Sequence, residues 1–389
     1  MNNTDEGPQE NDESKTNNQS DTKIDNPTLS RRKTLKLAGA SGVIAGLNSI
    51  PAVAADNDDT VEITITKKGD CAAETREVPK EWYDHTKQSR DAKSTFMDDI
   101  SEHSESIQMV MRGTQEAEID GYKKHNIKVR MSEDVGPDIP DFLPDKVDGI
   151  PVEVEFGPRP QPGGCNDHYN NQPDPMIGGL RMDSSDSCGT ICVRVKDYRG
   201  SQDEWVTRML GARHLFTGIC NDSDVTGNSW YQYSSTEVGE IDRDWQRLDA
   251  VLLDRQHTNR GFGDEIVNEG TTVYGRVTGD GLDCFKSKKT TLKKRGINTG
   301  LEKGEITDTS ASDWYCSSNS VSGRVATNHN MNDGDSGGPT YYENNNGDLW
   351  LVMMNHTYSS DHTYGISAEH LNSEEGLWFG GNPNDGPCN

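Results

Sequence analysis

Short apolar runs dominate the chain after residue 164, and Gly, Asn, Asp or Ser residues separate them at fairly even spacing. The runs are rich in Val, Ile, Thr and aromatic residues, which favour strands. They include GTICVRVKD (189–197), EWVTRML (204–210), LDAVLLD (248–254), GTTVYGRVTG (270–279), SGRVATN (322–328), LWLVMMN (349–355) and TYGISAEHL (363–371). This pattern predicts one all-β unit, built either as a sandwich or as barrels.

The segment from 55 to 164 has a different pattern. Residues 80–113 mix charges with sparse apolar positions, which predicts one or two exposed helices. Residues 119–156 form short apolar runs split by prolines, which predicts short strands. We therefore expect a small α+β region here. The Pro/Gly-rich stretch PRPQPGG (158–164) predicts a linker between it and a second domain at 165–389.

The N-terminus predicts export. Residues 1–29 are polar and predict disorder. Arg31 and Arg32 form a twin-arginine pair before an apolar run at 35–50, and a small-residue cleavage site ends at Ala54. A membrane anchor is the alternative, but the run is rich in Gly, Ala and Ser and short for a span. We expect a twin-arginine signal peptide within residues 1–54 and a secreted mature chain without a membrane span.

The charge excludes two classes of partner. The chain has 39 Lys and Arg against 65 Asp and Glu, a net charge of −26. Such a surface repels nucleic acid and anionic lipid. Apolar residues make up only 31%, but seven Trp, twelve Tyr and eight Cys argue against disorder. We therefore expect a folded, halophilic protein with an acidic surface, and a monomer.

Eight cysteines in an exported chain favour disulfides. They lie at positions 71, 165, 188, 192, 220, 284, 316 and 388. We expect Cys220 to pair with Cys188 or Cys192, and Cys284 to pair with Cys316. The spacing of Cys188 and Cys192 also fits half a zinc site, but no matching histidine or second cysteine pair completes it. The sequence predicts neither a metal nor a cofactor.

One serine lies among residues with almost no side chain, in NDGDSGGPTYY (332–342). Glycines around Ser336 fit either a tight loop or a nucleophile whose neighbouring N–H groups must face a substrate. A nucleophilic serine requires a base and a group that orients the base. His214 follows a strand directly in WVTRMLGARHLF, and Asp249 begins the apolar run DAVLL. A carboxylate buried there requires a partner, whereas Asp242 and Asp244 lie in a more polar stretch.

These motifs resemble the chymotrypsin clan of serine proteases. GDSGGP (334–339), GARHLF (211–216) and LDAVLL (248–253) contain the three residues in the order His, Asp, Ser. KKRGINTGLEKGEI (293–306) and MIGG (176–179) are similar to the hairpin and the mature start of the streptogrisin and α-lytic protease branch. The resemblance covers about 176–370 and implies two antiparallel β-barrels with the triad at their interface.

The resemblance also implies residue roles. Ser336 would be the nucleophile, His214 the base and Asp249 the residue that orients it. The N–H groups of Gly334 and Ser336 would form the oxyanion hole, and Asp335 would pair with the cation Lys294. Asn330 would lie at the base of the substrate pocket. Because Asn330 is neutral and Met331 and the strand 349–355 are apolar, we expect medium or large uncharged side chains there.

The sequence departs from the clan at two cysteines. The cysteine that usually follows the histidine is displaced to Cys220, and Asn332 replaces the half-cystine four residues before the serine. The predicted activity is an exported serine endopeptidase acting on proteins or peptides. One alternative is a catalytically inactive, protease-fold binding protein. Residues 55–164 are either a pro-segment of a zymogen or a retained accessory region, with a surface-binding module as the other possibility.

Overall fold

The computed structural model describes residues 59–100, 107–132, 140, 142–157, 173–185, 187–200, 203–218, 221–233, 236–316, 319–381 and 383, all within one compact unit. The tail and signal peptide predicted at 1–54 and the linker predicted at 158–164 lie outside these residues. Cys165, Cys220 and Cys388 lie outside them as well. Within the described ranges, no helix has both the length and the apolar character that a membrane span requires.

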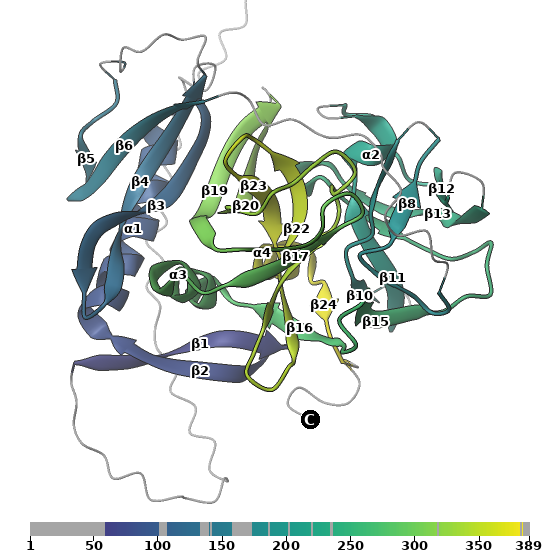
Figure 1. The fold of residues 1–389 in the computed structure, drawn as a ribbon. Coiled ribbons are helices and arrows are strands. Elements are labelled where there is room, and N and C mark those ends of the chain that lie inside the picture. The colour runs from purple at the N-terminus through teal and green to yellow at the C-terminus, as the bar shows by residue number, and fades with distance from the viewer. Residues whose placement is uncertain are drawn as a thin grey trace, which may run out of the picture. The chain divides into compact units, whose positions relative to one another are not determined.

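Strands make up most of the described chain and form two curled sheets, so the predicted all-β, chymotrypsin-like double-barrel fold is confirmed (Figure 1). The first sheet has eight strands. In spatial order they are β24 (Trp378–Phe379), β10 (Arg194–Arg199), β11 (Glu204–Ala212), β14 (Ala250–Leu253), β13 (Thr236–Trp245), β12 (Ser229–Gln232), β8 (Arg181–Asp183) and β9 (Cys188–Thr190). The pairing of Ala212 with Ala250 brings the ends of β11 and β14 together. The end of β11, which precedes His214, and the start of β14, which follows Asp249, therefore lie side by side.

The second sheet contains the C-terminal strands and, at its far edge, strands from the N-terminal region. Its main path is β18 (Gly300–Gly304), β17 (Leu292–Gly296), β21 (Pro339–Glu343), β22 (Leu349–Tyr358), β23 (Thr363–Ser367), β20 (Asn319–Thr327), β19 (Ile306–Cys316), β3 (Ile107–Ile119), β4 (Tyr122–Ser132), β6 (Ile150–Gly157) and β5 (Lys146–Val147). Off this path, β16 (Val273–Val277) pairs with β22 and with β1 (Thr60–Lys68), which pairs with β2 (Cys71–Pro79). A separate parallel pair joins β7 (Met176–Gly178) and β15 (Phe262–Ile266). The hairpin expected at 293–306 is formed by β17 and β18.

The helices among the described residues are short apart from the first. They are α1 (Lys80–Asp99), α2 (His214–Thr217), α3 (Gly279–Lys288) and α4 (Ala368–Glu375), and a 3-10 turn, η3 (Gln246–Leu248), precedes β14. The hydroxyls of Thr278 and Ser367 cap α3 and α4 by accepting from the N–H groups of Gly281 and His370. The helix α1, expected to be exposed, instead buries one face that includes Trp82, Ala92 and Phe96.

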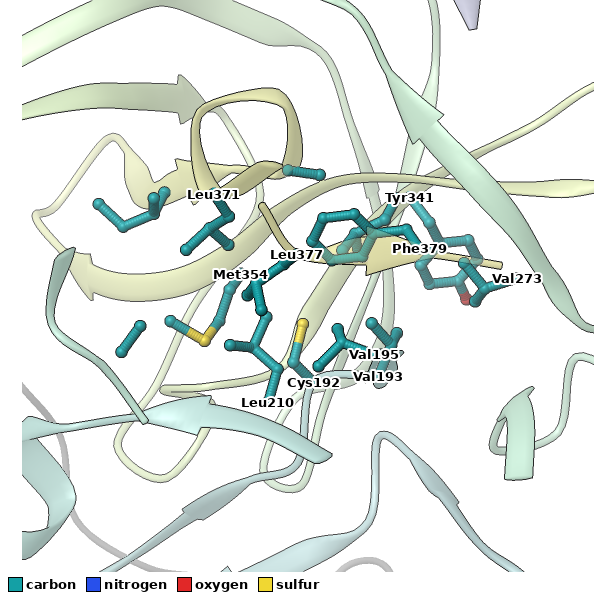
Figure 2. Packing of buried hydrophobic residues seen from close by; sticks show 14 of the residues in the cluster. Cys192, Val193, Val195, Leu210, Val273, Tyr341, Met354, Leu371, Leu377 and Phe379 are labelled. Carbon is teal, nitrogen blue, oxygen red and sulfur yellow. The ribbon is translucent and has the colours of Figure 1, made fainter. Parts of the chain in front are cut away.

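The apolar core that supports the site lies between the two sheets. Side chains of Leu210 and Leu252 from the first sheet pack with Tyr341, Leu351 and Met354 from the second (Figure 2). The same cluster reaches Leu248 and Ala250, on either side of Asp249. Because this packing fixes the ends of β14 and β22 against each other, residues from both sheets hold constant positions at the boundary.

Candidate active site

His214 and Asp249 form the centre of the site. Asp249 follows η3 with a positive φ of 47°, and its carbonyl oxygen accepts from the N–H of Arg213 at 3.0 Å. Its Oδ1 accepts from the backbone N–H of His214 at 2.8 Å, and its Oδ2 lies 2.5 Å from His214 Nδ1. These two contacts to one carboxylate fix both the backbone and the ring of His214.

A second histidine contacts the same carboxylate. The Nε2 atom of His356, near the end of β22, also bonds Asp249 Oδ2. Burial by itself would raise the pKa of Asp249, but the rings of His214 and His356 outweigh it and hold that pKa well below its usual range. The carboxylate is therefore ionised at neutral pH.

Ser336 lies in a loop that can only be built with glycine. Gly334 and Gly337 have φ values of 89° and 88°, and a Cβ on Gly337 would come within 2.2 Å of the Thr190 carbonyl oxygen. Thr190 anchors the loop, since its N–H donates to Ser336 O at 2.8 Å and its hydroxyl to Gly334 O at 2.7 Å. Within the described part of the chain, the N–H groups of Gly334 and Ser336 have no acceptor, so both are available to an incoming oxyanion.

The hydroxyl of Ser336 donates to the carbonyl oxygen of His356 at 2.9 Å. His214 Nε2 is buried and has no hydrogen-bond partner among the described residues. The two groups therefore both lie next to His356 but are not bonded to each other. Rotation about the Cα–Cβ bond can move the Ser336 hydroxyl between acceptors.

Asp335, beside the serine, forms the buried ion pair expected from the sequence. Lys294 Nζ lies 2.7 Å from Asp335 Oδ2 and also donates to Thr299 Oγ1 at 2.7 Å. Asp335 Oδ1 accepts from the N–H groups of Asn298 and Thr299. Burial lowers the pKa of Lys294, although Asp335 opposes that shift. The charge of Asp335 is thus balanced within the second sheet.

A cavity of about 620 Å³ lies next to the serine loop, and Asn330 and Met331 line it. Its other lining residues are mostly polar, namely Thr299, Glu302, Asn328, His329, Asn332, Tyr358, Ser359, Ser360 and Asp361. The expected apolar wall from 349–355 is wrong, because those side chains are buried in the two cores. Asp333 accepts from Tyr358 Oη at 2.7 Å, and this bond, followed by burial, raises the pKa of Tyr358 to about 12.

The weaker carboxylate candidates have arginine partners. Asp244 lies 2.5 Å from Arg213 Nε, and Asp242 lies 2.6 Å from Arg208 Nε. The sequence could not separate these aspartates from Asp249 by charge alone. The strand register distinguishes Asp249 from the other two aspartates. Because Ala212 pairs with Ala250, the segments that continue beyond this pair bring Asp249 to His214.

Two of the disulfide expectations need correction. Cys192 and Cys284 are free and buried, so neither the pairing of Cys192 with Cys220 nor that of Cys284 with Cys316 is formed. Cys192 belongs to the apolar core between the sheets, and Cys284 lies 3.4 Å from Arg76 Nη1 of β2. Burial raises the pKa of both thiols. Cys188 is disulfide-bonded, as is Cys71, for which the sequence suggested no pairing.

Among the described residues, one group has the composition of a metal site: His214, Asp249 and His356, with ligand atoms within 4.8 Å of one another. The atoms that face each other are already joined by hydrogen bonds, both to Asp249 Oδ2. The group is therefore built as a hydrogen-bonded chain. Sequence reasoning left His356 unassigned, although a histidine closing the apolar run LWLVMMN was a usable signal.

Solved structures similar to this chain include bacterial serine proteases. Protease A of Thermobifida fusca is 20% identical, with a TM-score of 0.40, over 53% of this chain and 98% of that one. A Nocardiopsis protease is 16% identical (TM-score 0.39, 53% and 98%), and a glutamic-acid-specific serine protease is 16% identical (TM-score 0.36, 52% and 98%). No family model and no curated protein matches the chain. At these identities the roles of residues in this chain rest on its own geometry.

Proposed function

We propose that this protein is a serine endopeptidase that uses Ser336, His214 and Asp249. The observation that carries the proposal is the ring of His214, held through Nδ1 by an ionised carboxylate with Nε2 unoccupied, beside a serine in a glycine-built loop. A base oriented in this way is what a serine requires to become a nucleophile.

The reaction would run in two halves. Ser336 Oγ attacks the peptide carbonyl carbon while its proton passes to His214 Nε2, and the free N–H groups of Gly334 and Ser336 bind the oxyanion. The protonated His214 then gives its proton to the leaving amine, which leaves an acyl-enzyme. Water attacks the carbonyl carbon of that ester while His214 takes a proton from the water. The bond to Ser336 Oγ then breaks, the carboxylic acid product leaves, and His214 returns the proton to Oγ.

Access to the serine is restricted. The residues Ser336 and His214 are 0% and 5% exposed. A peptide must therefore displace part of the surrounding chain, and the cavity at Asn330 is an open volume that reaches the serine loop at Asn332. A catalytically inactive binding protein with this fold is the alternative, and reactivity of Ser336 separates the two.

Labelling with a fluorophosphonate tests the proposal. The purified protein should be modified at Ser336 and nowhere else, as mapped by peptide mass spectrometry, and should lose peptidase activity in step. Ser322→Ala, at an exposed serine of β20, is the matched control and should label normally. Ser336→Ala should not label. A folded protein that resists labelling would favour the binding function.

We further propose that the N-terminal region remains part of the working enzyme instead of being discarded as a pro-segment. One core cluster is shared between Ile65 and Trp82 of this region and Leu282, Phe285 and Trp350 of the protease sheet. Strand β3 also pairs with β19, and β1 pairs with β16. Removal of the region would expose this apolar surface to water.

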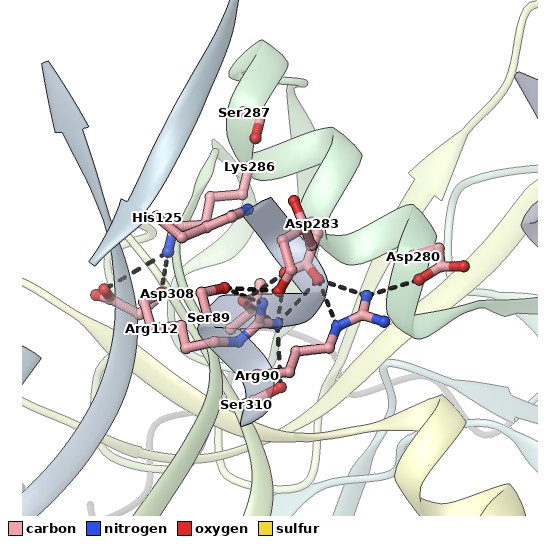
Figure 3. Close-up of polar contacts among 12 residues, drawn as sticks. Ser89, Arg90, Arg112, His125, Asp280, Asp283, Lys286, Ser287, Asp308 and Ser310 are labelled. Carbon is pink, nitrogen blue, oxygen red and sulfur yellow. Dashed lines mark hydrogen bonds and ion pairs between the residues drawn. The ribbon is translucent and has the colours of Figure 1, made fainter. Parts of the chain in front are cut away.

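Buried ion pairs support the same conclusion (Figure 3). Arg112 of β3 and Arg90 of α1 lie 2.7 and 2.6 Å from the fully buried carboxylate of Asp283 in α3. Lys286 of α3 donates to the Arg112 carbonyl oxygen. Burial lowers the pKa of Lys286 to about 7, with Asp308 opposing the shift. Removing one side of such a cluster leaves charges without partners.

Intact-mass measurement of the active, secreted protein tests this proposal. A mass that includes residues 59–157, or two fragments that separate only in denaturant, supports retention. An active species that lacks the region would show that it is a pro-segment. Export by the twin-arginine route is also a proposal, based on Arg31 and Arg32, and Arg31→Lys/Arg32→Lys should keep the protein inside the cell.

A further inference from the structure

A buried chain of hydrogen bonds extends the site beyond the three residues discussed above. The rings of His214 and His356 both bond Asp249 Oδ2 and meet edge to face, with centroids 5.0 Å apart. Behind His356, Arg324 of β20 places Nη1 3.0 Å from its Nδ1. Arg324 and His356 are each 2% exposed, so water does not compete for these bonds.

The arginine determines where His356 holds its proton. A guanidinium only donates, so Nδ1 of His356 must accept and its single proton must be on Nε2. That proton points at the carboxylate, and the ring therefore donates to Asp249 without carrying a charge. Burial, with Arg324 as the next cause, lowers the pKa of His356 to about 4 and outweighs Asp249. The charged or titratable groups that face the ring are Arg324, Asp249 and His214.

We propose that Arg324 and His356 are positioning residues that hold the Asp249 carboxylate and, through it, keep Nε2 of His214 directed toward Ser336. This inference rests on the proposed peptidase function. His356 is doubly placed for the role, since its backbone oxygen accepts from the Ser336 hydroxyl at 2.9 Å while its ring bonds Asp249. One residue thus sets the spacing between the nucleophile and the carboxylate.

The neutral ring also keeps Arg324 away from the carboxylate. Without it, the guanidinium would be free to pair directly with Asp249 and compete with His214 for the same oxygen. With it, Asp249 keeps its full charge for the imidazolium that forms when His214 takes the serine proton. The hydrogen bonds from Arg324 through His356 to Asp249 therefore support His214 in two ways. They fix the position of the carboxylate, and they leave its negative charge in place.

Three variants test the proposed roles of His356 and Arg324, with kcat, KM and the pH profile as the measurements. His356→Phe removes both ring bonds and should lower kcat about ten- to a hundredfold, as expected for a lost hydrogen bond to a charged group, with KM changed less than threefold. His356→Gln can accept from Arg324 and donate to Asp249, and should recover most of kcat. Arg324→Met should lower kcat and raise the pKa of His356 part of the way toward its ordinary value, because one of the causes that lower it is gone while burial remains. The activity of this variant should therefore begin to fall at a higher pH than that of the wild type.

Arg276→Met is the control, because Arg276 is an equally buried arginine, on β16 of the same sheet, that bonds Glu369 of α4. It should lower the free energy of unfolding but leave kcat and the pH profile unchanged. All rates are taken per active site titrated with fluorophosphonate, so poor folding of one variant does not affect them. Wild-type kcat and pH profiles in both His356→Phe and Arg324→Met would overturn the inference. Activity in Ser336→Ala would instead overturn the peptidase function itself.

Discussion

Lys294 Nζ lies 2.7 Å from Asp335 Oδ2 with both side chains fully buried, one residue away from the proposed nucleophile. Lys294→Met leaves the carboxylate without its cation and should lower the free energy of unfolding by about 3–5 kcal/mol. Urea denaturation measures this loss. The double variant Lys294→Met/Asp335→Asn removes both charges and should recover part of the stability. Lys303→Met, at an exposed lysine of β18, should have almost no effect.

Loss of either proposed triad residue should reduce turnover without unfolding the protein. Ser336→Ala should lower kcat by about 10⁶, and Asp249→Asn by about 10⁴, the magnitudes known for such losses in well-studied serine proteases. Asp244→Asn is the control, because Asp244 pairs with Arg213. If Asp244→Asn reduces kcat more than Asp249→Asn does, the assignment of the orienting carboxylate is wrong.

Substrate preference should follow the uncharged residues around Asn330 in the cavity. Asn330 and its amide neighbours offer no buried counter-charge for a basic side chain, so cleavage of a denatured protein mixture should favour uncharged residues before the cut. Asn330→Asp should shift the cuts toward Lys and Arg, because it supplies that charge. Glu302 and Asp361 also line the cavity, but Glu302 is only partly buried and Asp361 is exposed, so water screens both charges and they should disfavour acidic residues more than they select basic ones. A wild-type protein that cuts mainly after Lys or Arg would contradict this prediction.

Salt should stabilise the protein. A net charge of −26 repels itself, and about 1 M salt shortens the screening length to roughly 3 Å. Melting temperatures measured from 0.1 to 3 M NaCl should rise steadily. Sucrose at matched osmolality is the control for effects other than screening. A flat profile in NaCl would remove the halophilic interpretation and leave the peptidase proposal intact.

The thiols should separate into two classes. Cys192 and Cys284 are buried, and burial raises the pKa of both thiols. Iodoacetamide should therefore not label them in the folded protein, and should label them once the protein is denatured, even with no reductant present. Peptide mapping under the same conditions should find Cys188 bridged to Cys220, which would fix the loop carrying His214 and stabilise by roughly 3 kcal/mol on the loop-entropy model. A free Cys188 would contradict this pairing.

The sequence by itself determined the strand-rich C-terminal region, because alternation and turn residues are local signals. It proposed Ser336, His214 and Asp249 from their local surroundings, while the pairing of β11 with β14 decided which aspartate faces His214. It also gave the pair of Lys294 and Asp335 through a resemblance. Only the tertiary structure decided the rest. The second histidine on Asp249, the arginine behind it and the N-terminal strands joined to β16 and β19 all depend on residues far apart in the chain. The same holds for Cys284, which remains free beside Arg76 of β2. Contacts of this kind arise from register and packing between sheets, which no short stretch of sequence records.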